Sequence, residues 1–249
     1  LQNIGRFGFR HLGVPCSGAS DRQSMMYVNG LLRNPTVTPV LEVFGQGGRF
    51  EVMSDCVICF AGAEALITVN SQKKDFSKPI TCRPGEAIHI EKLINGAILY
   101  LGISGGFYAP PVMESVSYLK DTHLTTFKKG DKLYAHILRN HSIPSGAALK
   151  LPLISKTKKI HVFKGPEFDI LSNESKAEIF EESFRITPQS NRMGYRLQGH
   201  PMSKLSTIEM LTSAVTPGVV QLLPDGQMII LMRDCQTTGG YPRILITDE

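Results

Sequence analysis

The sequence predicts a mainly β protein with two β-rich domains and a few short helices. Short apolar or alternating runs dominate, turn signals rich in Gly, Pro and Asn separate them, and only two segments have a helical pattern. A chain of 249 residues exceeds the usual size of one compact domain. We predict an N-terminal β-rich domain at 1–150, with a Gly-rich first segment and one helix, and a C-terminal β domain at 151–249.

Two series of apolar runs predict the strands of these domains. The first series comprises 40–44, 50–53, 56–60, 65–69, 87–90 and 97–103. Its turn signals are Gly45–Gly48, Arg83–Glu86 and Asn95-Gly96. The second series comprises 160–163, 184–186, 219–223, 228–232 and 244–246. The polar, small-residue stretch 141–148 separates the two series, so we place the domain boundary near residue 150. This pattern is typical of a β barrel or sandwich.

Two segments favour helices. Ser20 and Gln23 fit a capping box, in which both side chains satisfy amides of the first turn. The residues that then share one apolar face are Met25, Val28 and Leu32. Asn34-Pro35 ends this helix.

The second predicted helix covers 173–182. Asn173 is its predicted N-cap, because a short polar side chain can accept a hydrogen bond from the first-turn amides. Ile179 and Phe180 are predicted to face inward.

Composition excludes several classes of protein. Hydrophobic residues make up 42% and charged residues 20%, and no apolar run is long enough to span a membrane, so we expect a soluble, cytoplasmic protein. The net charge of +5 comes from scattered Lys and Arg without a basic stripe, which argues against a nucleic-acid partner. The chain has no P-loop, dinucleotide fingerprint, Gly-x-Ser-x-Gly elbow or zinc-ligand His pair, so we expect neither a self-contained ATPase nor a metal site.

The five cysteines predict free thiols in a reducing compartment, because their number is odd and a chain of this size needs no disulfides. Cys56 and Cys59 have the spacing of a redox motif but lie in an apolar run. Residues three apart on a strand face opposite sides, so these thiols are predicted to diverge.

Three polar segments are candidates for chemistry. The first runs from Gln2 to Asp21 and combines four Gly with two Arg, one His and two Ser before a helix. Close backbone approach and helix-start amides fit a carboxylate or phosphate. The alternative is a structural loop in which Arg6 pairs with Asp21. The candidate ligand contacts are Arg6, His11, Ser17 and Asp21.

The second polar segment is 187–196, a turn between two strands. Arg192 can fork onto a carboxylate or phosphate, and Gln189 with Asn191 can hydrogen-bond an amide. Alternatively, Asn191 and Gly194 only serve the turn.

The third polar segment follows the apolar strand 228–232 and gives the strongest local signal. Asp225 lies in the turn before that strand. After the strand come an acid, an amide, two hydroxyls, a Gly pair and a Tyr, in a place where β scaffolds display functional loops. The candidate residues there are Asp234, Gln236, Thr237, Thr238 and Tyr241.

Four motifs carry a family resemblance over nearly the whole chain. Gln2–Gly8, Gly13–Ala19, Pro188–Gly194 and Gln236–Pro242 resemble, in order, motifs of the allophanate hydrolase subunit 2 family, also called the biotin-dependent carboxyltransferase or KipA-like family. The sequence departs from that family at four positions. Asn3 and Asn191 stand where Asp is usual, Cys16 where Pro is common, and Cys235 where Arg is common.

The resemblance implies two β-barrel domains related to the cyclophilin-like fold, the second being cyclophilin-like. It also implies a subunit of an ATP-dependent 5-oxoprolinase that opens 5-oxoproline to glutamate with a KipI-like (allophanate hydrolase subunit 1) partner and a LamB/YcsF-type subunit. ATP is then used by the complex, at a site not located in this chain. We expect Asp234, Arg192 and Arg6 to be catalytic, with charge stabilised by one of the arginines or by the Asp234 loop. The expected substrate-binding residues are His11, Ser17, Asp21, Gln189, Asn191, Asp225, Gln236, Thr237, Thr238 and Tyr241.

Two alternatives remain open. The chain could be the carboxyltransferase component of a urea carboxylase or allophanate-type system, which requires biotin delivered by another protein. It could also be a non-catalytic regulator that binds the KipI-like partner, since Asn3 and Asn191 replace two possible bases.

Overall fold

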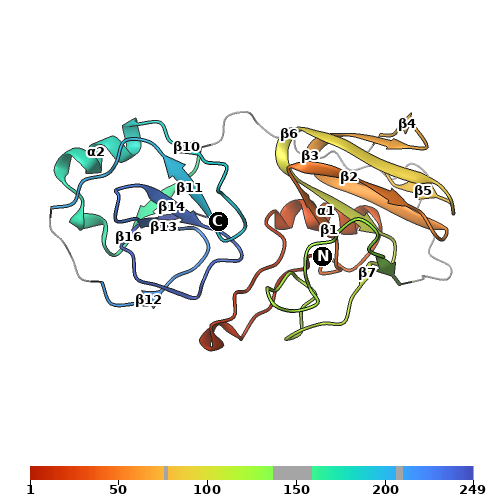
Figure 1. Ribbon diagram of the computed structural model, residues 1–249, viewed down its shortest axis with the longest axis horizontal. Helices are drawn as coiled ribbons and strands as arrows, with labels where there is room; N and C mark the ends of the chain where they lie inside the picture. Colours follow the sequence, from red (N-terminus) through yellow and green to blue (C-terminus); the bar gives the residue numbers. More distant parts are fainter. Residues whose placement is uncertain (76–77, 137–158, 206–209, 249) are drawn as a thin grey trace. The chain divides into compact units, whose positions relative to one another are not determined.

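The computed structural model describes residues 1–75, 78–136, 159–205 and 210–248 (Figure 1). The chain divides into two compact units: Leu1–Arg6 with Ser17–Lys156, and Phe7–Cys16 with Thr157–Glu249. The segment Phe7–Cys16, which the sequence placed in the N-terminal domain, groups with the second unit in this division. The stretch 141–148 and the boundary near 150 lie outside the described residues.

The first unit is built on an antiparallel sheet around two long strands, β3 and β6 (Figure 1). Its strands are β1 (Leu41–Phe44), β2 (Gln46–Glu51), β3 (Cys56–Val69), β4 (Gln72–Lys73), β5 (Ile80–Cys82) and β6 (Ala87–Ile103). The order is β1-β6-β3-β4, with β2 also on β6 and β5 also on β3. A separate pair joins β7 (Phe107–Tyr108) to β8 (Tyr134–Ala135). Each of the two long strands therefore pairs with different short strands along its two halves.

Of the turns predicted in the first unit, Asn95-Gly96 is wrong because it lies inside a strand, and Gly45–Gly48 is correct only at Gly45, which separates β1 from β2. Asn95-Gly96 was predicted to separate two strands but lies within β6, where the β3 register shifts around Glu64 accommodate it as a bulge. Most of the predicted turn at Gly45–Gly48 is the start of β2. Gly47 is needed there because a Cβ would come 1.8 Å from the Ile90 carbonyl oxygen. Glycine here permits close strand approach rather than chain reversal.

Helix α1 (Arg22–Leu31) packs against this sheet. Its predicted apolar face is confirmed, since Met25, Val28 and Leu32 are fully buried with Cys59 and Tyr100. The predicted N-cap is wrong. Asp21 caps the helix, with its Oδ1 accepting from the Ser24 amide at 3.0 Å. The Gln23 side chain donates to the Tyr27 hydroxyl rather than folding back to the cap.

The second unit contains a six-stranded antiparallel sheet in the order β10-β11-β14-β13-β16-β9 (Figure 1). The strands are β9 (Val162–Lys164), β10 (Arg185–Ile186), β11 (Gly194–Gln198), β13 (Val219–Leu222), β14 (Met228–Leu231) and β16 (Arg243–Thr247). A short pair joins β12 (Ser213–Ala214) to β15 (Thr238–Gly239). The second unit also contains two 3-10 turns, η1 (Arg10–Leu12) and η2 (Phe168–Ile170).

Helix α2 (Asn173–Glu181) corrects two details of the prediction. Its N-cap is Ser172, whose Oγ accepts from the Ser175 amide at 3.1 Å, and not Asn173. Ile179 is buried as predicted, whereas Phe180 is 59% exposed. Neighbouring helical residues point about 100° apart, so a helix with one narrow buried face holds only one of the two.

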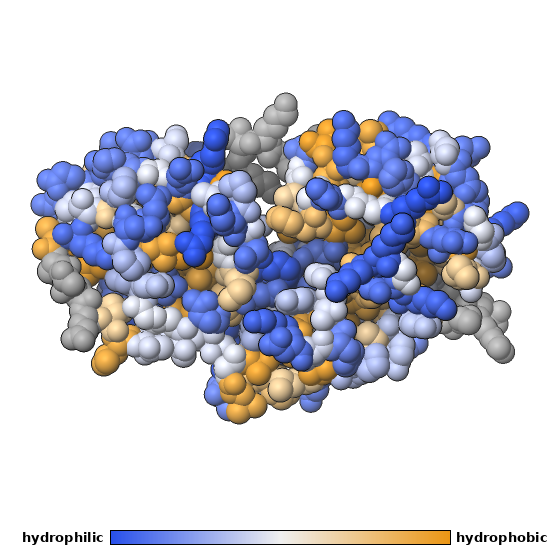
Figure 2. Space-filling model, viewed as in Figure 1, coloured by the Kyte–Doolittle hydropathy of each residue, from blue (hydrophilic) through white to orange (hydrophobic). Residues whose placement is uncertain are grey.

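The predicted mainly β class is confirmed, with antiparallel sheets and two α-helices among the described residues. Among the described residues, no pairing joins the first and last strands in the order of either six-stranded sheet, so both sheets are open there. All five cysteines are free thiols, as predicted. Cys56 and Cys59 do diverge, since they pack into different apolar clusters. No helix in the described ranges is long and apolar enough to cross a membrane. Hydrophilic side chains cover much of the face in Figure 2, with apolar ones interspersed.

Candidate functional site

The strand order of the second unit brings two of the predicted polar segments together. Strand β11 runs antiparallel to β14, and Gly194 lies opposite Leu231. The segment that enters β11 therefore adjoins the segment that leaves β14. Two backbone hydrogen bonds join them, from the Met232 amide to the Met193 carbonyl at 3.0 Å and from the Asp234 amide to the Arg192 carbonyl at 2.8 Å.

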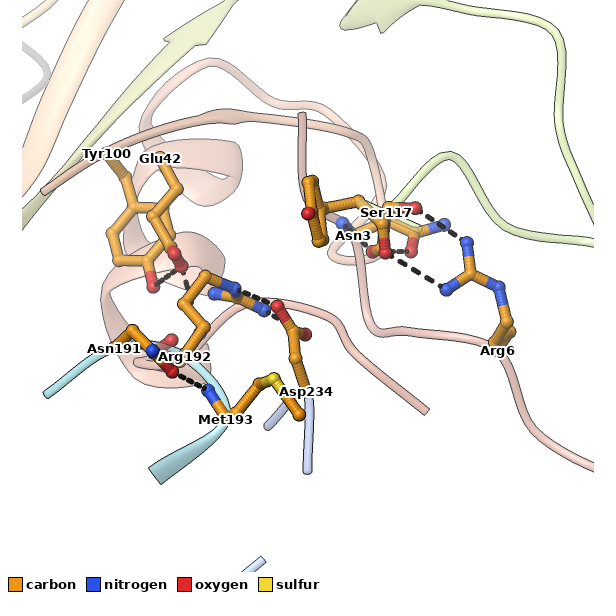
Figure 3. A network of polar contacts seen from close by, with 11 residues as sticks. Asn3, Arg6, Glu42, Tyr100, Ser117, Asn191, Arg192, Met193 and Asp234 are labelled. Atoms are coloured by element: carbon orange, nitrogen blue, oxygen red, sulfur yellow. Dashed lines mark hydrogen bonds and ion pairs between the residues drawn. The ribbon is translucent and has the colours of Figure 1, made fainter. Parts of the chain in front are cut away.

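Arg192 and Asp234 form a forked ion pair at this junction (Figure 3). Arg192 Nε donates to Asp234 Oδ2 at 2.7 Å, and Arg192 Nη2 donates to Asp234 Oδ1 at 2.9 Å. The Asp234 side chain is 7% exposed and the Arg192 side chain 22% exposed. Bidentate pairing fixes the plane of the guanidinium, so Asp234 holds Arg192 in one orientation while part of Arg192 remains accessible.

The loop after Asp234 is organised around Gln221, a buried side chain of β13. Gln221 Nε2 donates to the Tyr241 carbonyl at 3.2 Å, and Gln236 Nε2 donates to Gln221 Oε1 at 3.5 Å. Gly239 lies so close that a Cβ there would meet Gln221 Nε2 at 2.6 Å. The loop thus depends on one amide at its centre. Among the other candidate residues of the loop, the Thr237 carbonyl accepts a hydrogen bond from the Val215 amide at 3.0 Å. Thr238 and Tyr241 are exposed.

Three other candidates of the second unit have turn or surface positions. Asn191 Oδ1 accepts from the Met193 amide at 2.8 Å, which is an Asx turn (Figure 3). Gln189 is exposed beside it in the sequence. Asp225 caps the β13–β14 turn by accepting from the Gln227 amide at 3.0 Å. That turn lies at the opposite end of the hairpin from Asp234, so the structure separates these two acids.

Arg6 lies in a polar network of the first unit (Figure 3). Its side chain is 1% exposed, with Nη2 donating to the Ser117 carbonyl at 2.6 Å and Nη1 to the Tyr118 carbonyl at 3.2 Å. Asn3 Oδ1 accepts from the Gly5 amide, Ser115 Oγ and Ser117 Oγ, at 2.9, 2.8 and 2.7 Å. Arg6 and Asn3 therefore join the first residues of the chain to the 115–118 segment.

Ser17 and Asp21 lie in the first unit, and the structure gives them different roles. Ser17 is 1% exposed with a left-handed φ of 53°, and its Oγ has no hydrogen-bond partner among the described residues. Gly18 follows it, where a Cβ would meet backbone atoms of Ile4 and Gly5 at 2.8 Å. The Asp21 side chain caps α1. Among the described residues it forms no ion pair with Arg6. His11 is exposed on η1 in the second unit.

Sequence reasoning missed several polar side chains around these segments. Arg10 donates to the Val215 carbonyl and interacts with Cys235, a buried thiol whose pKa burial raises to about 11. Arg243 and Glu167 form a second forked pair, at 2.9 Å for Nε–Oε2 and 2.7 Å for Nη2–Oε1. Tyr100 donates to Glu42 at 2.6 Å in the first unit. A buried Gln or Tyr inside a strand gives no local signal, because only the fold reveals its partners.

The described residues contain no group of three or more His, Cys, Asp and Glu that could hold a metal ion. The site of the second unit is thus a forked Arg192–Asp234 pair beside a polar loop. Such an arrangement can orient a planar cation toward an anionic or carbonyl group.

This chain belongs to the carboxyltransferase domain family, since residues 12–249 match the family described as "Carboxyltransferase domain, subdomain A and B". It is 33% identical to the C subunit of the 5-oxoprolinase of Escherichia coli (strain K12), over 98% of this chain and 79% of that protein.

Urea amidolyases are also similar to this chain. The protein of Saccharomyces cerevisiae is 32% identical over 78% of this chain and 11% of its own length. The crystal structure of the K. lactis urea amidolyase has the same fold, with a TM-score of 0.89 at 24% identity. That match covers all of this chain but only 17% of the K. lactis chain, so this chain corresponds to a small part of the larger protein.

Proposed function

We propose that this chain is one subunit of an ATP-dependent 5-oxoprolinase that opens 5-oxoproline to glutamate. Its partners in this proposal are a KipI-like subunit and a LamB/YcsF-type subunit. The observation that carries the proposal is the 33% identity to the C subunit of a 5-oxoprolinase over 98% of this chain. The free thiols support a reducing, cytoplasmic setting for such a complex.

We assign Arg192 to the binding of an anionic group, either the carboxylate of 5-oxoproline or charge that develops on its ring amide. Arg192 fits this role because its guanidinium is oriented by two bonds to Asp234 and its side chain keeps 22% exposure. Asp234 becomes the positioning residue of Arg192, since both of its oxygens accept from that guanidinium. The loop after Asp234 supplies the proposed contacts to the ring amide of the substrate. These residues are Gln236, Thr237, Thr238 and Tyr241.

We assign Arg6 a positioning role in the N-terminal segment, because its buried guanidinium donates to the backbone at Ser117 and Tyr118. Ser17 is the better contact for a ligand there, since its hydroxyl is buried without a partner among the described residues. We assign nucleotide binding to the assembled complex, because this sequence has no P-loop.

Reconstitution tests the proposal. The chain is purified with the two partner proteins and glutamate release from 5-oxoproline is measured with and without ATP. We expect activity from the three proteins together and none when this chain is omitted. A fully active pair of the other two proteins would refute the proposal. Arg192→Lys in the complex separates the assigned role from assembly: we expect normal co-purification with at least a roughly tenfold loss in kcat/KM, because Lys lacks the planar fork.

Carboxyl transfer is the second candidate function, favoured by the family description and by the similarity to urea amidolyases. Biotin would then be delivered by another protein, and the amides and hydroxyls of the 236–241 loop would hold a planar urea-like substrate. Transfer of a carboxyl group from carboxybiotin to urea by this chain, with no glutamate release in the reconstituted complex, would favour this function over the first.

A regulatory protein that binds the KipI-like partner without catalysis is the third candidate. The sequence feature that suggests this role is the presence of Asn3 and Asn191 in place of two acids. Both amide oxygens instead accept hydrogen bonds from nearby donors, which a carboxylate would equally do. Turnover that Arg192→Lys abolishes while the complex persists would exclude a purely regulatory role.

A further inference from the structure

Two cysteines of the first unit face each other across neighbouring strands. Cys56 of β3 lies directly opposite Cys82 of β5 in the antiparallel register. Cys82 is fully buried and Cys56 is half-buried, and both pack in the same apolar cluster. Ile58 and Ile80, two residues further along each strand, face each other in that cluster as well. The two thiols therefore point to one side of the sheet and toward each other.

This register suits a covalent link. Directly opposed residues of antiparallel strands have Cα atoms about 4.5–5.5 Å apart, and a disulfide accepts about 4.4–6.8 Å. The register therefore places Cys56 and Cys82 within the range that a disulfide accepts. β5 is only three residues long and pairs with β3 alone among the described strands, so it can adjust to the bond.

The two thiols also differ in reactivity. A hydrogen bond from Cys82 is the main cause that lowers the pKa of Cys56, against burial and the charges of Asp55 and Glu86. The same contact and burial raise the pKa of Cys82. Cys59, three residues along β3, is deeply buried on the other face and its pKa is raised to about 12. Cys56 is thus the more nucleophilic member of the pair, because thiolates rather than thiols react with oxidants.

We propose that Cys56 and Cys82 are an oxidation site, which a hydroperoxide such as hydrogen peroxide converts into a cross-strand disulfide between β3 and β5. The Cys56 thiolate attacks one peroxide oxygen, the O–O bond breaks, and a sulfenic acid forms at Cys56 as hydroxide leaves and takes a proton to become water. The Cys82 sulfur then attacks the Cys56 sulfur, and the sulfenic oxygen leaves with the Cys82 proton as a second water. Overall, two thiols are oxidised to one disulfide and one peroxide is reduced to two waters.

The bond attaches a short strand covalently to the long strand of the sheet. In the reduced protein only three residue pairs, starting with Cys56 and Cys82, hold β5 on β3. A link between residues 56 and 82 restricts the unfolded chain and resists separation of β5 from the sheet. The oxidised first unit is therefore more resistant to heat than the reduced one, and a thiol reductant reverses the change.

Peptide mapping of the wild-type full-length chain tests the site. The reduced protein is treated with hydrogen peroxide, remaining thiols are blocked with iodoacetamide, and the protein is digested without reductant. We expect one linked peptide pair that contains Cys56 and Cys82, lighter by two hydrogens than the two reduced peptides together, and its loss after treatment with dithiothreitol. Oxidation of Cys56 only to sulfinic acid, or no reaction of either residue, overturns the proposal.

Thermal unfolding supplies the second readout. Peroxide is expected to raise the unfolding midpoint of the full-length wild-type protein, and dithiothreitol to restore it. Cys56→Ser is expected to show no such rise, while the control Cys16→Ser, which removes a partly buried thiol of the second unit, keeps it. A rise that persists in Cys56→Ser refutes the assignment. If Cys56→Ser does not fold, the peptide map of the wild-type protein decides alone.

Discussion

Asp234 is the residue on which the polar junction of the second unit depends. Its side chain is 7% exposed and both oxygens accept from Arg192. Asp234→Asn keeps one acceptor oxygen but removes the charge and leaves a guanidinium donor without its partner. We expect the free energy of unfolding to fall by about 1–3 kcal/mol, measured with urea.

The matched control is Asp225→Asn in the exposed β13–β14 turn, where the amide oxygen can still accept from Gln227. That change is expected to lie within about 0.5 kcal/mol of the wild type. Equal losses in the two variants would mean that the forked pair contributes nothing specific.

Asn3 shows how an apparent loss of a catalytic acid can be structural. Its Oδ1 accepts from three donors, two of them the hydroxyls of Ser115 and Ser117, which are fully buried. Asn3→Ala leaves these donors without an acceptor, so we expect a loss of about 1–3 kcal/mol in urea unfolding.

Asn3→Asp introduces a carboxylate that offers the same acceptor oxygen, so stability within about 1 kcal/mol of the wild type is expected. A large loss in Asn3→Asp would show that the site rejects a carboxylate. Near-normal stability in Asn3→Ala would show that the network is dispensable.

At the scale of elements, the packing of α1 on the sheet is set by Gly102 of β6. A Cβ at Gly102 would come 2.1 Å from Cγ1 of Val28, on the buried face of α1, and 2.9 Å from Cδ1 of Leu32, the buried C-cap of α1. Gly102→Ala therefore pushes α1 away from β6. We expect the free energy of unfolding, measured with urea, to fall by about 1–3 kcal/mol, as in overpacked cores.

Gly30 provides the control for this prediction, because a Cβ there meets nothing within 4 Å and the residue lies inside α1. Gly30→Ala is expected to stabilise the protein by about 0.5–1 kcal/mol through helix propensity. If both changes destabilise to the same degree, the contact between Gly102 and α1 is not the cause.

The two helices show how far local sequence rules reach. The apolar face of α1 follows from spacing alone and is buried as predicted. Both caps shift by one residue, to Asp21 and Ser172, because several polar residues stand in a row at each helix start. The choice among them depends on where the preceding chain enters. At α1 the Ser20 amide donates to Glu42 and the Asp21 amide donates to Tyr100, which leaves the Asp21 side chain in the cap position.

At the scale of the whole molecule, acid stability of the second unit is linked to the Glu167–Arg243 pair. The hydrogen bonds of Arg243 hold the pKa of Glu167 below its ordinary value of 4.5. A carboxylate whose folded pKa is lowered stabilises the protein above its unfolded pKa, and this contribution disappears as the pH falls through the folded pKa. The pair joins the N-cap of η2 to the first residue of β16.

Glu167→Gln is therefore expected to be less stable than the wild type at about pH 7, with a difference that shrinks below about pH 4. Urea midpoints of both proteins across this range measure the effect. The control is Glu181→Gln, an exposed acid on α2, whose difference from the wild type is expected to stay small at each pH. A pH-independent difference in Glu167→Gln would contradict the assignment.

The sequence by itself determined the mainly β class, the places of most strands and both helices, because hydrophobic periodicity reflects which side of an element is buried. It also marked the polar segments around Arg192 and Asp234, since polar clusters at strand ends stand out locally. Only the tertiary structure decided which of them meet. The antiparallel β11–β14 register joins Arg192 to Asp234, and the β13–β14 hairpin sends Asp225 to the far end. Gln221, Asn3 and the Cys56–Cys82 pair likewise gain their roles from partners distant in sequence, and no local pattern encodes which residues will be opposite.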